Sequence, residues 1–326
     1  MERSFVEESV ETSFSLNRKV FSKETVMALA ALCASRVIMS FTPILITLSD
    51  HQIGPNATAF WREAIAFILL SAMEGTLVLN SQISGNQPEK QEKYTGRVLG
   101  LLLGTGIMAT LYVICWVWSL SLTSVTNVTV ISDCLNPLFT ILGGWLFFGQ
   151  VFDRFFLIGM VITIGGVVTI GLNDLSQAVG QVYGDLIALG VAIFLAIYYL
   201  LAEQLRVGLS TKTILLWRCG IGTVIMLPIM LVSGDRFWPA SWEEWSLLVS
   251  VAFVGQILGH GLSLYSVKKL TSGLVAFSML VVPVLSAMEA TLILSEKVNL
   301  LNFVSFALVL LGMYFAISSS QGAIKE

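Results

Sequence analysis

The sequence predicts an all-α polytopic membrane protein in which ten transmembrane helices form two inverted five-helix repeats, with both termini cytoplasmic. Three observations predict this fold class: the composition, a series of apolar windows, and landmarks that recur in both halves. Of the 326 residues, 56% are hydrophobic and 12% are charged, and the mean hydropathy is +0.83. Soluble domains carry about 25% charged residues. The composition therefore excludes a soluble globular protein.

Apolar windows of roughly 20 residues, long enough to span about 30 Å of hydrocarbon, define the predicted helices. They fall at 24–48, 58–79, 97–119, 125–148, 153–172, 183–205, 211–233, 242–266, 271–294 and 299–319. Residues 1–23 are polar and mixed in charge, so they are predicted to form a disordered cytoplasmic tail. Residues 320–326 are predicted to form a short cytoplasmic C-terminal tail.

Lysine and arginine predict the orientation, because they are enriched in cytoplasmic loops. With the N-terminus inside, only Arg236 and Lys297 would lie outside. The cytoplasmic segments would hold Arg3, Arg18, Lys19, Lys23, Lys90, Lys93, Arg97, Arg154, Arg206, Lys212, Lys268, Lys269 and Lys325. Both termini are therefore expected in the cytoplasm, and the protein in the inner or plasma membrane.

Two landmarks recur at equivalent helices: an aromatic-Arg pair opens the second helix of each half, and a proline lies in the middle of the fourth. These residues are Trp61-Arg62 and Trp217-Arg218, and Pro137 and Pro283. The repeats are placed at 24–172 and 183–319. Because each repeat holds an odd number of helices, the two enter the membrane from opposite sides, as in many alternating-access transporters.

These landmarks resemble the drug/metabolite transporter (DMT) superfamily, EamA type, which also carries a late glycine in the fifth helix, here Gly166 and Gly312. The resemblance implies a secondary transporter that exports amino acids or similar metabolites. One position departs from the family pattern. The fourth helix ends at Gln150 where the family usually has Glu, although Glu296 keeps the acid in the second half.

Arg36 is expected near the centre of the first helix, where an arginine costs about 2.5 to 3.5 kcal/mol by insertion scales. It is a candidate to bind a substrate carboxylate or phosphate. The alternative is a structural pair with Asp133 or Glu289. On the first interpretation, Arg36→Ala abolishes substrate binding in a folded protein; on the second, the variant binds normally or fails to fold.

The fourth helix carries Asp133 four residues before Pro137, with Asn136 beside the proline. A proline inside a helix frees the carbonyl four residues earlier, which here belongs to Asp133. Asp133 and Asn136 are therefore candidates to bind a polar ligand group, and Asp133 also to carry a proton. A structural pair between Asp133 and Arg36 is the alternative.

Gln256 and His260 lie one turn apart on the eighth predicted helix, and Glu289 lies mid-span in the ninth. Histidine titrates near neutral pH, and a proton-coupled carrier requires a carboxylate that alternates between neutral and charged forms. Asp133, His260 and Glu289 are thus candidates for proton coupling, and Gln256 and His260 for substrate binding. Hydrogen-bonded core residues are the alternative.

Tyr112, Trp116 and Tyr199 carry polar-tipped rings that suit a cavity for a flat or cationic solute, although such rings more often serve packing or an interfacial belt. A hinge or gate is expected from the recurring landmarks, with interfacial anchoring as the alternative for the Trp-Arg pairs. The hinge or gate candidates are Trp61, Arg62, Pro137, Trp217, Arg218 and Pro283.

Other function classes lack their residue patterns. No HExxH, Ser/His pair or clustered Asp pair predicts an enzyme, and the four cysteines lie singly in apolar spans, which predicts neither a disulfide framework nor a metal site. No basic run predicts nucleic-acid binding and no P-loop predicts nucleotide hydrolysis. No cofactor is expected. The expected partners are a small-molecule substrate, the lipid bilayer and protons as coupling ion.

The sequence thus predicts a secondary transporter that moves a small polar metabolite, an amino acid or similar compound, by alternating access. Nucleobases, nucleotide-linked sugars and amphipathic drugs are the alternative substrates, and a non-transport membrane protein is a less favoured alternative. A nucleotide-linked sugar would require several cations in the cavity, where the sequence places only Arg36.

Overall fold

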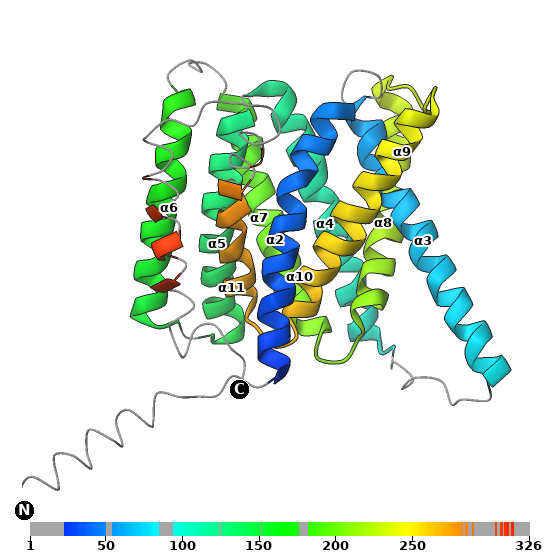
Figure 1. Ribbon diagram of the computed structural model, residues 1–326, viewed down its shortest axis with the longest axis horizontal. Helices are drawn as coiled ribbons and strands as arrows, with labels where there is room; N and C mark the ends of the chain where they lie inside the picture. The colour runs from blue at the N-terminus through cyan, green and yellow to red at the C-terminus, as the bar shows by residue number, and fades with distance from the viewer. Residues whose placement is uncertain are drawn as a thin grey trace, which may run out of the picture.

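The protein is a helical bundle in the computed structural model shown in Figure 1. The structure describes residues 23–49, 54–84, 94–123, 125–150, 152–175 and 182–282, together with 284, 285, 289, 304, 307, 308, 310–312, 314 and 315. No strand occurs in these ranges. Pro283 and both predicted tails, apart from Lys23, lie outside the described residues.

The first half holds five helices: α2 (Lys23–Ser49), α3 (Pro55–Ser84), α4 (Gly96–Leu122), α5 (Val125–Phe148) and α6 (Arg154–Leu175). The second half begins with α7 (Val182–Leu205) and α8 (Thr211–Ser233). Its third segment has three parts: α9 (Trp242–Ser250), the π-helix η1 (Val251–His260) and α10 (Gly261–Ser266). The α-helix α11 (Ser272–Phe277) then continues as the 3₁₀-helix η2 (Ser278–Val281).

Local sequence explains where several helices begin. A Ser or Thr oxygen accepts a hydrogen bond from the backbone N–H three residues later, which satisfies a donor that has no partner inside the helix. This cap is made by Thr95 for α4, Ser210 for α8, Ser241 for α9 and Thr271 for α11. After α8 the chain turns at Gly234, whose φ of 79° favours glycine.

Among the described residues, six helical segments are long and apolar enough to cross a membrane. They are Lys23–Phe41, Gly96–Ser119, Ile131–Phe148, Val182–Leu205, Thr211–Ser233 and Trp242–Ser266. The 30-residue α3 is about 45 Å long at 1.5 Å per residue, but it carries Arg62, Glu63 and Glu74, which lower its hydropathy. Arg154–Gly166 and Ser272–Val281 are shorter apolar stretches. Ten membrane helices therefore remain a prediction.

The first helices of the two halves run in opposite directions. The start of α2 lies beside the end of α10, since Glu24 pairs with Lys269 at 2.5 Å. The end of α7 lies at this same end of the bundle, because Glu203 accepts a hydrogen bond from the N–H of Ser272, three residues after Lys269. This end, drawn lowest in Figure 1, is called the lower end below.

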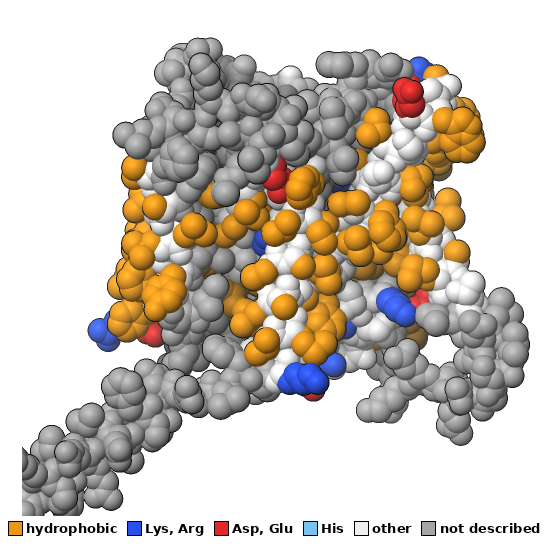
Figure 2. Space-filling view, in the orientation of Figure 1, with side chains coloured by type: hydrophobic (Ala, Val, Ile, Leu, Met, Phe, Trp, Pro, Cys, Tyr) orange, Lys and Arg blue, Asp and Glu red, His pale blue; other side chains and the backbone are white. Residues whose placement is uncertain are grey.

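Charged and apolar side chains are distributed unevenly over the bundle. Figure 2 shows hydrophobic side chains over the middle of the bundle and Lys and Arg along its lower edge. The described cations at helix ends are Lys23, Arg97, Arg154, Arg206, Lys212, Lys268 and Lys269 at the lower end and Arg236 at the upper end. An apolar belt with cations concentrated at one end is the distribution expected in a bilayer.

Helices of the two halves interleave. α4 packs against α7 and α8, α3 against α8, α5 against α7, and α2 against η1. At the α4–α8 contact a Cβ on Gly106 would lie 2.5 Å from Cδ1 of Ile221, so this approach requires glycine. The centre of the molecule is therefore built from both halves.

Candidate substrate site

Arg218 lies two turns inside α8 and is 1% exposed. Its Nη2 donates to the hydroxyl of Tyr112 on α4 at 2.8 Å. The guanidinium carbon lies 5.2 Å from the ring centroid of Tyr198 on α7 and 5.9 Å from that of Tyr112. From the sequence, Arg218 was expected at a helix entrance, where it would reach the interface. The structure instead buries it against two tyrosines.

Glu63 on α3 is buried beside Arg218. Its Oε1 accepts a hydrogen bond from Nε2 of Gln256 on η1. The same oxygen lies 3.7 Å from Nη2 of Arg62 and 4.0 Å from Nη2 of Arg218. The sequence analysis missed Glu63, although it directly follows Arg62 in the recurring Trp-Arg pair.

His260 ends the π-helix η1 and is buried. Its Nε2 lies 3.4 Å from the hydroxyl of Tyr112. The sequence predicted an α-helix throughout this segment, but η1 is wound as a π-helix, a geometry often found at functional sites.

Arg36 on α2 makes contacts that are satisfied within the protein. Its Nε donates to Oγ of Ser278 at 2.7 Å and its Nη2 to the carbonyl of Val275 at 3.0 Å. Its Nη1 contacts the sulfurs of Met279 and Met39. Among the described residues, no acid lies within ion-pair distance of Arg36. The expected pair with Asp133 or Glu289 is therefore not formed, and Arg36 joins α2 to α11 and η2 instead.

The other predicted polar residues lie on separate elements. Asp133 on α5 is partly buried, and Oγ of Ser132 donates to it at 3.4 Å. Asn136, fully buried one turn later, accepts from Oγ1 of Thr140 at 3.2 Å through its side-chain oxygen. Pro137 is buried within α5.

Glu289 lies in a part of the chain of which the structure describes only a few residues. Its Oε1 accepts from Oγ of Ser40 on α2 at 2.6 Å, and its buried Oε2 has no partner among the described residues. A carboxylate held by one hydroxyl can bind a proton on its other oxygen. The structure thus joins Glu289 to the first helix and not to Asp133 or His260.

The predicted aromatic residues divide between the centre and the upper end. Tyr199 on α7 is fully buried and lies 5.2 Å, centroid to centroid, from Tyr198. Trp116 and Trp217 are partly buried against the hydrophobic core. Trp61 lies at the upper end, where its Nε1 donates to the carbonyl of Phe237 at 2.7 Å.

Unpartnered polar atoms concentrate on the residues around Arg218. We call this set the central polar cluster: Arg62, Glu63, Tyr112, Tyr198, Tyr199, Arg218, Gln256 and His260. Its buried atoms with no hydrogen-bond partner in the described protein are Nε and Nη2 of Arg62, Oε2 of Glu63, the hydroxyls of Tyr198 and Tyr199, Nε and Nη1 of Arg218, Oε1 of Gln256 and Nδ1 of His260. Buried polar groups are normally hydrogen-bonded. This arrangement therefore offers donors and acceptors to a small polar molecule.

The packing of the two halves around a shared polar centre can be compared with known proteins. A model of the EamA-like transporter family matches residues 26–172 and again residues 182–318. The chain belongs to this family. It is an integral, multi-pass membrane transporter, and the two matches confirm the internal duplication that the sequence predicted.

Individual relatives agree with this assignment. The chain is 22% identical over 303 residues to a Bacillus subtilis (strain 168) protein named "Uncharacterized transporter YetK", covering 91% of this chain and 89% of the relative. A solved crystal structure superposes with a TM-score of 0.70 at 16% identity, over 91% of this chain and 99% of the other. This second likeness concerns the fold alone.

This chain has Gln150 at the position where the family usually has Glu, and the contacts of Gln150 explain the difference. Nε2 of Gln150 donates to Oε2 of Glu203 at 2.9 Å, and the N–H of Ser272 donates to the same oxygen at 3.1 Å. A Glu at position 150 would place a second carboxylate against Glu203, and like charges at this distance repel. Gln150 therefore joins the first repeat to the second at the lower end. A carboxylate at this position could not donate the hydrogen bond to Glu203.

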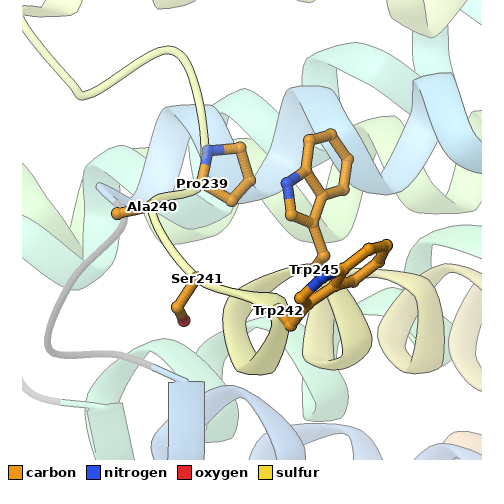
Figure 3. A pocket seen from close by; sticks show the side chains of 5 residues that line it. All are labelled: Pro239, Ala240, Ser241, Trp242 and Trp245. Atoms are coloured by element: carbon orange, nitrogen blue, oxygen red, sulfur yellow. The ribbon is translucent and has the colours of Figure 1, made fainter.

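A surface hollow of about 430 Å³ lies at the upper end of this EamA protein (Figure 3). It is lined by Pro239, Ala240, Ser241, Trp242 and Trp245. Trp245 also packs edge-to-face against Trp61, with 5.0 Å between ring centroids. None of the residues predicted to bind substrate lines this hollow.

Proposed function

We propose that this protein is a secondary transporter that exports a small polar metabolite, an amino acid or similar compound, by alternating access. The central polar cluster carries the proposal. It is buried between the two repeats, and many of its polar atoms have no partner among the described residues. Transporters built from inverted repeats bind their substrates at such an interface near the bilayer midplane.

Both repeats contribute to the cluster. Arg62 and Glu63 on α3 and Tyr112 on α4 come from the first, whereas α7, α8 and η1 of the second contribute the others. A relative motion of the repeats would therefore change the distances between Arg218 and Tyr112 and between Gln256 and Glu63. A substrate held by residues of both repeats is sensitive to that motion, as alternating access requires.

Contacts at both ends of the bundle also join the repeats. At the lower end Glu24 pairs with Lys269. At the upper end Oδ2 of Asp235 accepts from the backbone N–H groups of Asn56 at 2.8 Å and Ala57 at 3.1 Å. Opening either end requires that its contacts break, so the two ends act as opposing gates in the proposed cycle.

Flux measurements test the transport function. Purified protein in proteoliposomes is supplied with amino acids, nucleobases and organic cations, with and without a pH gradient. Saturable counterflow of one class is the expected result, and outward flux is expected from vesicles whose lumen corresponds to the cytoplasm. Folded protein that moves no tested solute would contradict the proposal.

Cross-links test alternating access in a variant whose four cysteines are replaced. At the lower end, where Glu24 and Lys269 meet through the tips of long side chains, the pair Glu24→Cys with Lys269→Cys is joined by a bis-thiol reagent that contains a cleavable disulfide. At the upper end, where a Gly54 Cβ would touch the Asp235 carboxyl, Gly54→Cys with Asp235→Cys is joined directly. Each cross-link should stop flux until it is reduced. The control pair, Ser210→Cys with Thr213→Cys, lies within one repeat and should leave flux intact. Undiminished flux with either end cross-linked rules out this cycle.

Proton coupling, proposed for Glu289, Asp133 and His260, has its own test. Glu289→Gln keeps the shape and removes the titratable group, so we expect substrate counterflow to persist while the response to a pH gradient disappears. Glu74→Gln on α3 is the matched control and should leave that response unchanged. A gradient response that survives in Glu289→Gln excludes Glu289 as the coupling group.

A further inference from the structure

We propose that the transported solute carries an anionic group, a carboxylate or a phosphate, and that Arg218 binds this group; the inference rests on the transport function proposed above. The site would be completed by the unpartnered hydroxyl of Tyr198 and by His260. It differs from the sequence interpretation, in which Arg36 was the anion-binding candidate.

Charge around Arg218 favours an anionic ligand. Arg218 is fully buried, and among the described residues Glu63 is the acid that lies within 4.0 Å of either Arg62 or Arg218. Two arginines therefore share one carboxylate here, and a buried excess of positive charge is costly unless an anion offsets it.

Hydrogen bonding at Arg218 also favours an anionic ligand. Nη2 of Arg218 is engaged by Tyr112, whereas its buried Nε and Nη1 have no partner among the described residues. A guanidinium presents planar donors that match the oxygens of a carboxylate or phosphate. Glu63 does not fill this role, because its Oε1 lies 4.0 Å from Nη2 of Arg218, beyond hydrogen-bonding distance.

The tyrosines around Arg218 are arranged to support a bound anion. The ring of Tyr198 lies against the Arg218 guanidinium, and its buried hydroxyl has no partner in the described protein. The stacked ring fixes the guanidinium, and the hydroxyl supplies a donor to an anion. His260 contacts Tyr112 through Nε2, so its unpartnered Nδ1 is available to a second polar group of the solute.

Arg36 does not compete for this role. Its three guanidinium nitrogens each contact a protein acceptor, including Ser278 and the carbonyl of Val275. Arg62 beside Arg218 also removes an objection to phosphate-bearing solutes, which was that the sequence placed only one cation in the centre. Carboxylate and phosphate are therefore separate arms of the test.

The decisive experiment compares solutes that differ only in the anionic group. One series is leucine, leucinamide and 3-methylbutylamine; the other is glycerol 3-phosphate, inorganic phosphate and glycerol. For each solute, counterflow in proteoliposomes and the melting temperature of the purified protein are measured. We expect the members of one series that carry a carboxylate or phosphate to bind at least tenfold more tightly than the members that lack this group.

The outcomes separate the inference from the transport function. Preference for the leucine arm or the phosphate arm identifies which anionic group is bound. Equal or tighter binding of leucinamide, 3-methylbutylamine or glycerol overturns the inference while transport stands. Folded protein that binds and moves none of the six solutes overturns the inference for both classes, and the flux screen above decides on transport separately.

Variants test the assignment to Arg218. Arg218→Gln should weaken binding of the anionic solute about 10- to 100-fold, the loss expected for charge-assisted hydrogen bonds worth 1.5 to 3 kcal/mol, and Arg218→Lys should restore part of it. Arg236→Gln, the same change at an exposed arginine of the upper loop, is the control. If Arg218→Gln does not fold, Tyr198→Phe should still weaken binding several-fold. Unchanged affinity in the folded variants would overturn the assignment.

Discussion

Arg36 and Arg218 are 3% and 1% exposed, and both lie within helices of the bundle. Their hydrogen bonds differ. Arg36 donates to Ser278 and Val275 across the contact between α2 and α11, whereas Arg218 keeps Nε and Nη1 without a partner in the described protein. Burial alone therefore does not identify a binding arginine; the partners of each nitrogen do.

The difference follows from what each arginine faces. Arg36 meets the junction between α11 and η2, where the carbonyl of Val275 also accepts from Oγ of Ser278 at 2.7 Å. Arg218 meets aromatic rings, which stabilise a guanidinium through their faces but accept few hydrogen bonds. Arg36 thus acts as a structural link between the repeats, and Arg218 is available to a ligand.

The largest effect is expected from Arg36→Ala, which tests whether Arg36 is a structural residue. Arg36→Ala removes the contacts between α2 and α11 and leaves a cavity, so we expect it to lower the free energy of unfolding by about 2 to 4 kcal/mol. Thermal unfolding of the purified protein measures this loss. A stable Arg36→Ala variant that no longer binds the solute would return the anion-binding role to Arg36.

Ser278→Ala tests the structural role of Arg36 through its hydrogen-bond partner. It removes the acceptor of Arg36 Nε, which leaves a buried charged donor unsatisfied, and we expect a loss of about 1.5 kcal/mol in stability. Solute affinity should stay within twofold of the parent protein. The change is read from the melting temperature, with Ser250→Ala on an exposed helix as the control; equal shifts for both variants would argue against the link.

Glu63→Gln tests the proposed binding of an anion by Arg218. Among the described residues, Glu63 is the carboxylate that lies within 4.0 Å of Arg218, so it competes electrostatically with an incoming anion. Its neutral replacement should tighten binding of the anionic solute about tenfold, equivalent to 1.4 kcal/mol. Titration by melting temperature or counterflow competition measures the affinity. Weaker binding in a folded Glu63→Gln variant would indicate that the solute is a cation or contacts Glu63 directly.

Tyr112→Phe should have the smallest effect. It removes the hydroxyl that accepts from Arg218 and lies near His260, but it keeps the ring against the guanidinium. We expect the affinity for the anion to change about threefold or less, since one neutral hydrogen bond is worth about 1 kcal/mol. A change larger than that in Arg218→Gln would make Tyr112 the main contact.

Much of the fold was predictable because apolar windows are local. The predicted helices 183–205 and 211–233 agree closely with α7 (Val182–Leu205) and α8 (Thr211–Ser233). The Trp-Arg pairs and mid-helix prolines indicated the EamA family, which the family match confirms. The π-helix η1 was not predicted, because its winding depends on contacts such as the one between Gly259 and Ser35, which come from a distant helix.

The site was less predictable. Gln256 and His260 were selected from the sequence, and the structure brings them beside Tyr112 and Glu63, although their role in binding remains a prediction. Glu63 and Tyr198 were missed, since an acid beside an arginine and a tyrosine in an apolar helix have ordinary local patterns. Conversely, the opposite charges of Arg36 and Asp133 suggested an ion pair, and these two side chains do not form one in the structure.

A helical membrane protein with a duplicated architecture could be predicted from the amino-acid sequence alone, because hydropathy and recurring landmarks are properties of short segments. Which buried charges have partners became clear only from the packing of the helices. Arg36 finds Ser278 and Arg218 finds Tyr112 across more than a hundred residues of chain, and such partners are set by how the helices pack. The proposed anion site therefore depends on the contact between the two repeats.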